Sequence, residues 1–279
     1  MTLQAFQKTK DFLICVDSDG CAMDTMDVKH LRCFGPCMVE EWGLEEWADP
    51  ILKRWNEVNL YTMTRGINRF KGLALALREI DGKYRSIDGV DELERWVANA
   101  PALSNDGVKA AIASGGGEVL KKALRWSVQV NERINALPFE VKKPFEGVAE
   151  GLKYAHDLAD IAIVSSANLQ AVEEEWALYG LLEHVDILLA QNVGSKAFCI
   201  AELLKKGYET DKVLMTGDAP GDLEAARANG VFYYPILVRR EGASWREFRE
   251  TAVDKLTAGS YGGAYQQEKL DAFLDNLNS

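Results

Sequence analysis

The second half of the chain alternates short apolar runs with segments of helical periodicity, and this alternation constrains the fold more than any other feature. The apolar runs occupy residues 161–164, 187–189, 213–215 and 231–238, and the helical segments occupy residues 147–158, 168–179, 196–206 and 222–228. Strands that alternate with short helices form a parallel sheet covered by helices on both faces. The sequence therefore predicts an α/β fold with a Rossmann-like core.

A further apolar run, residues 12–16, ends abruptly at Asp17-Ser18-Asp19-Gly20 and is typical of a strand buried on both faces. The residues that follow it carry tryptophans and other apolar side chains at helical spacing, without a convincing strand. We expect the first strand to join the later sheet, with the helical block as an insertion. The predicted domains are an α/β core, residues 1–25 and 140–279, and an all-helical cap domain, residues 26–139. The role of the terminal segment 242–279 stays open.

Composition excludes some classes of partner. The 279 residues carry a net charge of −11, so the surface repels nucleic-acid phosphate, and a phosphorylated ligand would need a local concentration of cations. The five cysteines are irregularly spaced, which favours reduced core residues over a disulfide framework or a zinc site. No segment has the length and apolarity of a membrane span. We expect a cytoplasmic protein with no nucleic-acid or membrane partner; the oligomeric state stays open.

Polar side chains follow the predicted strands at the points where ligands bind in open parallel sheets. Asp17 and Asp19 come directly after the first strand. A carboxylate at this position can attack phosphorus, and a second one can protonate the leaving oxygen and later deprotonate water. Gly20 would allow the backbone to approach a phosphate closely. Taken alone, the same residues also fit a strand-ending turn with an aspartate cap.

Three later loops carry further candidate site residues. Ser165 and Ser166 follow one predicted strand, and a hydroxyl there can bind a phosphoryl oxygen or cap the next helix. Lys196 begins a predicted helix, where it can neutralise phosphate charge or be simply solvated. Asp218 and Asp222 follow the strand at 213–215 and could help to bind a hard cation such as Mg²⁺, or cap a turn.

The order Asp-x-Asp, Ser, Lys and Gly-Asp-x-x-x-Asp, each after a strand, resembles the haloacid dehalogenase superfamily. The similarity lies in its phosphatase branch, in members with a helical cap inserted after the first motif. It covers the whole core domain, residues 12–24 and 147–238. One departure is Cys21, where the family usually has threonine. The resemblance implies hinges near residues 23–26 and 141–144.

The resemblance gives each of these residues a role in phosphoryl transfer. It implies that Asp17 is the nucleophile and a Mg²⁺ ligand, and that Asp19 is the general acid and base and binds the metal through its carbonyl. It further implies that Ser165, with Ser166 and Gly20, binds the phosphoryl group, and that Lys196 stabilises the nucleophile and the phosphate. Asp218 would bind Mg²⁺, and Asp222 would complete or support the metal site. Because the halide-releasing members lack the second aspartate, its presence argues for an oxygen leaving group.

The sequence thus predicts a Mg²⁺-dependent phosphohydrolase that cleaves a small phosphorylated metabolite through an aspartyl-phosphate. The alternatives are a phosphomutase of the same superfamily and a non-catalytic binding protein on this scaffold. In the predicted cap, Arg65 and Arg69 would crowd like charges if they shared a helix, and an anionic ligand would relieve this repulsion. Arg65, Asn68 and Arg69 are therefore hypothetical substrate contacts; the alternative is solvated arginines or pairing with acidic neighbours such as Glu57.

Overall fold

The computed structural model describes residues 2–278 and divides into two compact units, Met1–Met26 with Phe139–Ser279, and Asp27–Pro138. The first unit contains a five-stranded sheet with the strand order β5-β4-β1-β6-β7, and all its strands are parallel. The strands are β1 (Phe12–Val16), β4 (Ala159–Val164), β5 (Ile187–Leu189), β6 (Val213–Gly217) and β7 (Phe232–Pro235). The predicted α/β fold class is confirmed, and the N-terminal strand does join the later sheet.

The register of the central strand brings the ends of three strands together. Val16, the last residue of β1, pairs with Ile163 of β4 on one side and Thr216 of β6 on the other. The ladder continues one residue further, because the Asp17 amide donates a hydrogen bond to the Thr216 carbonyl at 3.0 Å. The loops that follow β1, β4 and β6 therefore begin at the same edge of the sheet.

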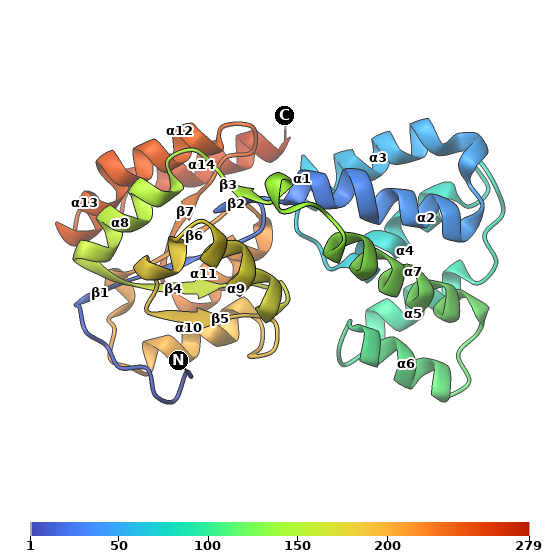
Figure 1. Cartoon of the computed structure of the whole chain (residues 1–279), viewed down its shortest axis with the longest axis horizontal. Helices are drawn as coiled ribbons and strands as arrows, with labels where there is room; N and C mark the ends of the chain where they lie inside the picture. The colour runs from blue at the N-terminus through green and yellow to red at the C-terminus, as the bar shows by residue number, and fades with distance from the viewer. Residues whose placement is uncertain (1, 279) are drawn as a thin grey trace. The chain divides into compact units, whose positions relative to one another are not determined.

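Helices cover both faces of this sheet, so its strands are largely buried and mostly apolar (Figure 1). They are α8 (Val148–Leu158), α9 (Leu169–Leu178), α10 (Lys196–Leu204), α11 (Pro220–Asn229), α12 (Glu241–Glu247), α13 (Val253–Thr257) and α14 (Ala264–Asn278), with the short turns η3 (Phe139–Val141), η4 (Leu181–His184) and η5 (Thr210–Lys212) and the π-helical turn η6 (Phe248–Ala252). One layer of the core packs Ile14, Ile161 and Leu214 of the sheet against Trp176 and Trp245.

The last strand, β7, is shorter than the predicted run 231–238. Gly230 ends α11 in the left-handed conformation, and the Val231 amide still bonds to the carbonyl of Ala226 in that helix. Beyond Pro235, the Val238 amide donates to the Asn276 side chain of α14 instead of continuing a ladder. Local capping at both ends therefore limits the strand.

A short antiparallel ribbon marks the two points where the chain passes between the units. It pairs β2 (Met23–Asp24) with β3 (Lys143–Pro144), and the Phe145 amide adds a bond to the Ala22 carbonyl at 3.0 Å. Because the chain leaves and returns through adjacent strands, the insertion interrupts the parallel sheet at a single loop. The predicted hinge segments coincide with this ribbon.

The second unit is built from helices around an aromatic core. Its elements are α1 (Met26–Lys29), η1 (His30–Phe34), α2 (Gly35–Trp42), η2 (Glu45–Trp47), α3 (Ala48–Leu60), α4 (Arg69–Ile80), α5 (Val90–Asn99), α6 (Asn105–Ala113) and α7 (Glu118–Asn135). Trp126 is fully buried, makes edge contacts with Trp55 and Phe70, and donates to the Phe34 carbonyl at 3.1 Å. This unit therefore has a hydrophobic core of its own.

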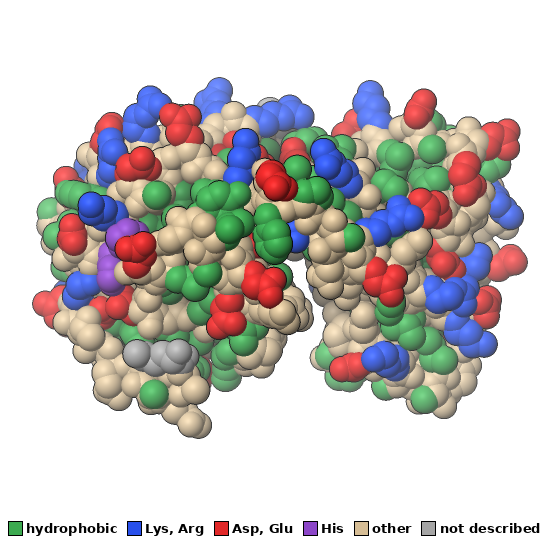
Figure 2. All heavy atoms as spheres, in the orientation of Figure 1, with side chains coloured by type: hydrophobic (Ala, Val, Ile, Leu, Met, Phe, Trp, Pro, Cys, Tyr) green, Lys and Arg blue, Asp and Glu red, His purple; other side chains and the backbone are tan. Residues whose placement is uncertain are grey.

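The basic side chains of this acidic chain are dispersed over the surface. Figure 2 shows acidic and basic side chains interspersed on the visible face of each unit. Within residues 2–278, no helix combines the length and the apolarity that a membrane crossing requires.

Candidate active site

Three aspartates converge at the carboxyl ends of β1 and β6. Asp17 directly follows β1, Asp218 directly follows β6, and Asp222 lies in the first turn of α11. All three are buried, and each offers a carboxylate oxygen within 4.8 Å of the others. In the described part of the chain, this is the only such group of three or more potential metal-ligating side chains. The fold thus brings together residues separated by some two hundred positions in the sequence.

Lys196 places its ammonium between two of these carboxylates. Its Nζ lies 2.8 Å from Asp17 Oδ2 and 2.5 Å from Asp222 Oδ1. The lysine is the first residue of α10, and the Ser195 hydroxyl caps that helix by accepting from the Phe198 amide. Burial alone would lower the pKa of Lys196, but the adjacent carboxylates outweigh this effect and raise the pKa above its ordinary value. The side chain is therefore a fixed positive charge at neutral pH.

Asp222 holds both the lysine and the loop after β6. Its Oδ1 accepts from Lys196, and its Oδ2 accepts from the backbone amides of Asp218 and Ala219 at 3.2 and 3.1 Å. The loop can fold this tightly because Gly217 has no side chain: a Cβ there would lie 2.3 Å from Asp222 Cγ. Both oxygens of Asp222 thus already accept hydrogen bonds from donors of the protein, which favours a supporting role.

The site carries more negative charge than its lysine can balance. Burial is the main cause that raises the pKa of Asp17 well above its usual range; Lys196 opposes this shift, and Asp222 and Asp218 add to it. A divalent cation would remove the imbalance. The groups that converge here are carboxylate oxygens, which Mg²⁺ prefers. The donor chemistry of this site therefore fits magnesium.

The turn after Asp17 orients the second aspartate of the motif. Gly20 adopts φ +82°, a left-handed conformation that suits glycine, and its amide bonds to the Met23 carbonyl. The chain thereby turns back, and the Thr25 hydroxyl donates to Asp19 Oδ1 at 2.6 Å. Asp19 is partly exposed, unlike Asp17. Asp19 is thus held by Thr25, a residue that no sequence motif indicated.

The two serines after β4 differ in their environment. Ser165 is buried, and its Oγ accepts from the Ala167 amide at 3.1 Å, while Asn168 provides the N-cap of α9. A serine hydroxyl that accepts one hydrogen bond can still donate its own proton to a phosphate oxygen. Ser166 is exposed. The geometry therefore favours Ser165 over Ser166 as a ligand for a phosphoryl group.

The three candidate residues of the helical unit do not lie as the sequence predicted. Helix α4 begins at Arg69, with Asn68 as its N-cap accepting from the Phe70 amide, and Arg65 lies before it in a turn. The prediction that Arg65 and Arg69 crowd like charges on one helix is wrong, because the asparagine cap separates them. Arg65 is buried and donates to the Leu60 carbonyl at 2.7 Å.

Arg69 is embedded among neutral groups. Its NH1 donates to the Ser127 carbonyl and hydroxyl and to Asn131 Oδ1, and its guanidinium lies 5.1 Å from the centre of the Phe34 ring. Burial lowers the pKa of Arg69 to about 10. No carboxylate of residues 2–278 forms an ion pair with it. Arg69 is thus a half-buried cation whose described contacts are with neutral groups.

Several further contacts to the site loops come from residues that belong to no sequence motif. Trp176 of α9 donates to the Ser18 hydroxyl at 2.9 Å, and Trp245 of α12 donates to the Cys21 carbonyl at 2.9 Å. The Cys21 thiol bonds weakly to the Thr216 carbonyl, at 3.5 Å. These contacts cross large distances in the sequence, so they stabilise the loop after β1 through tertiary packing alone.

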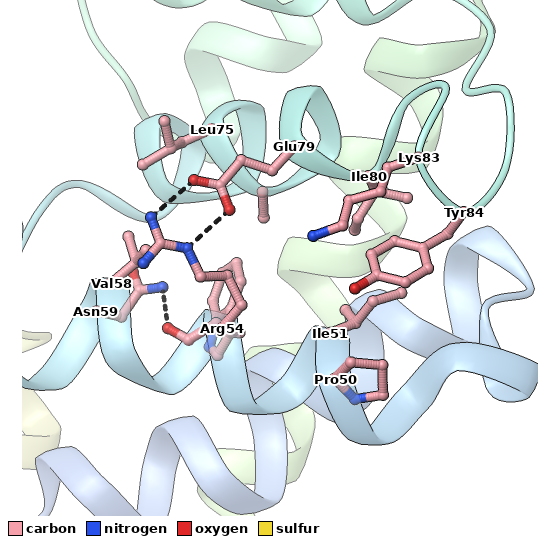
Figure 3. A pocket seen from close by; sticks show the side chains of 12 residues that line it. Pro50, Ile51, Arg54, Val58, Asn59, Leu75, Glu79, Ile80, Lys83 and Tyr84 are labelled. Atoms are coloured by element: carbon pink, nitrogen blue, oxygen red, sulfur yellow. Dashed lines mark hydrogen bonds and ion pairs between the residues drawn. The ribbon is translucent and has the colours of Figure 1, made fainter.

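The helical unit also contains a small cavity between α3 and α4 (Figure 3). Its volume is about 30 Å³, and Arg54 and Glu79 form a two-pronged ion pair at its edge, with N–O distances of 2.8 and 2.9 Å. Pockets for metabolites and drug-sized ligands are typically ten or more times larger, roughly 300–1,000 Å³. The cavity is therefore a packing gap rather than a substrate site.

The fold and the site together define a Rossmann-like α/β domain with an acidic centre at the carboxyl ends of its strands. The family model described as haloacid dehalogenase-like hydrolase matches residues 103–235, which include Ser165, Lys196, Asp218 and Asp222. The match spans a little less than half of the chain, and over this segment the chain is similar to the family.

Solved structures give the same fold. A haloacid dehalogenase-like family hydrolase from Streptococcus pneumoniae is 12% identical with a TM-score of 0.53, covering 86% of this chain and 91% of its own. A haloacid dehalogenase-like family hydrolase from Xanthomonas campestris is 14% identical with a TM-score of 0.53, covering 91% of this chain and 97% of its own. The search of curated proteins gives no significant match.

Proposed function

We propose that this chain is a Mg²⁺-dependent phosphohydrolase that cleaves a small phosphorylated metabolite through a phosphoryl group carried on Asp17. The observation that supports this most is the contact between Asp17 and Lys196, 2.8 Å apart and buried at the end of the central strand. The ammonium opposes the effect of burial on Asp17 and so favours the ionised carboxylate that a nucleophile requires. It is also close enough to balance charge on an arriving phosphoryl group.

The reaction follows from the placement of the two aspartates. A carboxylate oxygen of Asp17 attacks phosphorus, the ester P–O bond breaks, and Asp19 gives its proton to the leaving oxygen. Water then attacks the phosphorus of the aspartyl-phosphate while Asp19 takes up a proton, and inorganic phosphate leaves with Asp17 restored. The hydrogen bond from Thr25 orients Asp19 for both proton transfers.

Asp17 and Asp218, with the backbone carbonyl of Asp19, would hold the Mg²⁺ ion, and Asp222 would support them through Lys196 and the loop amides. The bound ion supplies positive charge that offsets the carboxylates and the phosphate. Ser165 would donate its hydroxyl proton to a phosphoryl oxygen, next to the backbone of Gly20.

The helical unit would contribute to recognition of the substrate through Arg69. All the hydrogen bonds of Arg69 within the described chain come from NH1, so its Nε and NH2 groups can meet an anionic substrate group. Arg69→Gln should then raise KM several-fold with little change in kcat. Arg54→Gln is the matched control, because Arg54 pairs with Glu79 on the surface. Equal KM values for Arg69→Gln and wild type would remove Arg69 from the substrate site.

Phosphate release from a panel of phosphorylated metabolites, with Mg²⁺ and with EDTA, tests the proposed reaction. We expect turnover that requires Mg²⁺, is lost in Asp17→Asn and persists in Asp160→Asn. Asp160 is also a buried aspartate, but it lies near the opposite end of the sheet, in β4. Release without a bisphosphate activator favours a phosphatase over a phosphomutase. A folded wild type that releases no phosphate from any compound would contradict the hydrolase assignment.

A further inference from the structure

Tyr233 connects the last strand of the sheet to the loop that carries Asp218. It is a buried residue of β7, and its hydroxyl donates to the Gly217 carbonyl at 3.0 Å. The same carbonyl accepts from the Ile236 amide at 2.8 Å. Because a carbonyl oxygen has two lone pairs, these two donors fill its capacity and fix its direction.

The peptide group between Gly217 and Asp218 is therefore held at both ends. Tyr233 and Ile236 hold its carbonyl, and Asp222 Oδ2 accepts from its N–H at 3.2 Å. A fixed peptide plane fixes the N–Cα bond of the next residue and so limits the directions in which its side chain can leave the backbone. That side chain is the carboxylate of Asp218.

Tyr233 is in turn anchored by the C-terminal segment. The Tyr261 hydroxyl donates to the Tyr233 carbonyl at 2.9 Å, and the Tyr233 amide donates to Gln266 Oε1 at 3.2 Å. The ring of Phe273 packs edge-on against the Tyr233 ring, with 5.3 Å between ring centres. The segment after β7, whose role the sequence left open, thus reaches the site loop through this tyrosine.

The Tyr233 phenol acts as a donor in its neutral form. Burial is the main cause that raises the pKa of its phenol well above the ordinary value, and the charges of Asp222 and Asp218 add to the shift. An ionised phenolate could not donate to a carbonyl, whereas the neutral phenol does.

We propose that Tyr233 is a positioning residue for the divalent cation, which it serves by orienting the Gly217–Asp218 peptide, with the C-terminal segment as its support. The inference rests on the proposed function, because it takes Asp218 to be a Mg²⁺ ligand. Tyr234 provides an internal control: it is the next residue of the strand, is equally buried, and donates to the Ser244 carbonyl at 2.7 Å. Adjacent strand residues point to opposite faces, so only Tyr233 faces the metal loop.

The test compares wild type, Tyr233→Phe and Tyr234→Phe by the rise in unfolding temperature as MgCl₂ is added, and by Mn²⁺ binding followed with electron paramagnetic resonance. Each variant loses one hydroxyl that donates to a buried carbonyl, so both should unfold at similarly lowered temperatures without metal. We expect Tyr233→Phe to need about 10-fold more Mg²⁺ and Mn²⁺ than wild type, the usual size of an effect on groups that orient metal ligands. Tyr234→Phe should titrate like wild type.

Two other results overturn the inference in different ways. If wild type responds to the cations and Tyr233→Phe responds at the same concentrations, or if both variants are weakened equally, Tyr233 has only a structural role and the proposed function stands. If wild type itself binds neither cation, the metal site fails, and the proposed function and this inference fall together.

Discussion

At the scale of single residues, Lys196 supplies the positive charge that partly balances the buried carboxylates of the site. Its single positive charge lies between two of the three buried carboxylates, in contact with both Asp17 and Asp222. Removing one partner of a buried ion pair leaves the other charge uncompensated and typically costs about 3–5 kcal/mol. The lysine should therefore matter for stability as well as for catalysis.

Lys196→Met tests this expectation. In EDTA at pH 7, we expect a loss of about 3 kcal/mol in the free energy of unfolding, because Asp17 and Asp222 then face each other without a cation. Added Mg²⁺ should restore part of that stability, but phosphate release should stay abolished. Lys205→Met is the control, since Lys205 pairs with Glu202 at the surface, and it should change stability by less than about 0.5 kcal/mol. Equal unfolding curves for the two variants would count against the charge balance described here.

Asp160, at the start of β4, leads to a prediction about how the stability of the protein depends on pH. It accepts hydrogen bonds from the backbone amides of Thr9 and Lys10, at 2.9 and 3.0 Å, and from the hydroxyls of Thr9 and Tyr208. Burial would raise the pKa of Asp160, but the bonds from Thr9 and Tyr208 outweigh it and lower the pKa below its usual value. A lowered pKa means that the folded protein favours the ionised form.

The stabilisation from Asp160 should therefore be complete above the ordinary carboxyl pKa of about 3.9 and should be lost as pH falls through the lower pKa of the folded state. Asp160→Asn should cost about 2 kcal/mol at pH 7, as judged from urea unfolding. The difference between wild type and variant should shrink below about pH 4. A difference that is constant from pH 7 to pH 3 would show that the carboxylate charge does not contribute.

At the scale of elements, the start of α4 shows how a cap decides which residues share a helix. The Asn68 side chain accepts from the Phe70 amide at 2.9 Å and donates to the Leu103 carbonyl at 3.0 Å. Asparagine is among the preferred N-cap residues, so the helix start at Arg69 was available from the sequence. Spacing alone, without this cap, led to the wrong grouping of Arg65 with Arg69.

Asn68→Ala should destabilise the helical unit by about 1 kcal/mol, the usual cost of losing an N-cap side chain. Asn99→Ala is a suitable comparison, because Asn99 lies near the end of α5 and donates only to the Arg95 carbonyl. Hydrogen exchange of the α4 amides would locate the effect. Unchanged exchange in the first turn of α4 would mean that the cap contributes little.

The strands and turns also explain which site residues could be predicted from the sequence. Asp17, Ser165 and Asp218 could be named because each directly follows an apolar strand, and parallel strands align their carboxyl ends. Thr25 and Tyr233 could not, because their contacts depend on a backward turn and on the register of an edge strand. The fold class is confirmed, and the family match over residues 103–235 agrees with the predicted superfamily, whereas the roles of the individual site residues stay predictions.

At the scale of the whole molecule, the chain consists of two units with separate hydrophobic cores. The core unit contains the acidic site, and the ribbon of β2 and β3 carries the chain out of it and back. This arrangement lets the helical unit vary without disturbing the sheet that positions Asp17. We therefore expect substitutions in the helical unit to change KM and the choice of substrate, and substitutions at the strand ends to change kcat.

The central claim is that Asp17 carries the phosphoryl group, and trapping that group tests it most directly. The enzyme is mixed with the preferred substrate of the phosphate-release panel and Mg²⁺, quenched in acid during turnover, and its peptides are examined by mass spectrometry. We predict the added mass of one phosphoryl group on the peptide that contains Asp17. Borohydride should reduce the acyl phosphate at that residue, and the added mass should be absent from Asp17→Asn. Steady turnover with the phosphoryl group on another residue, or with no covalent phosphoryl group at any quench time, would contradict the account.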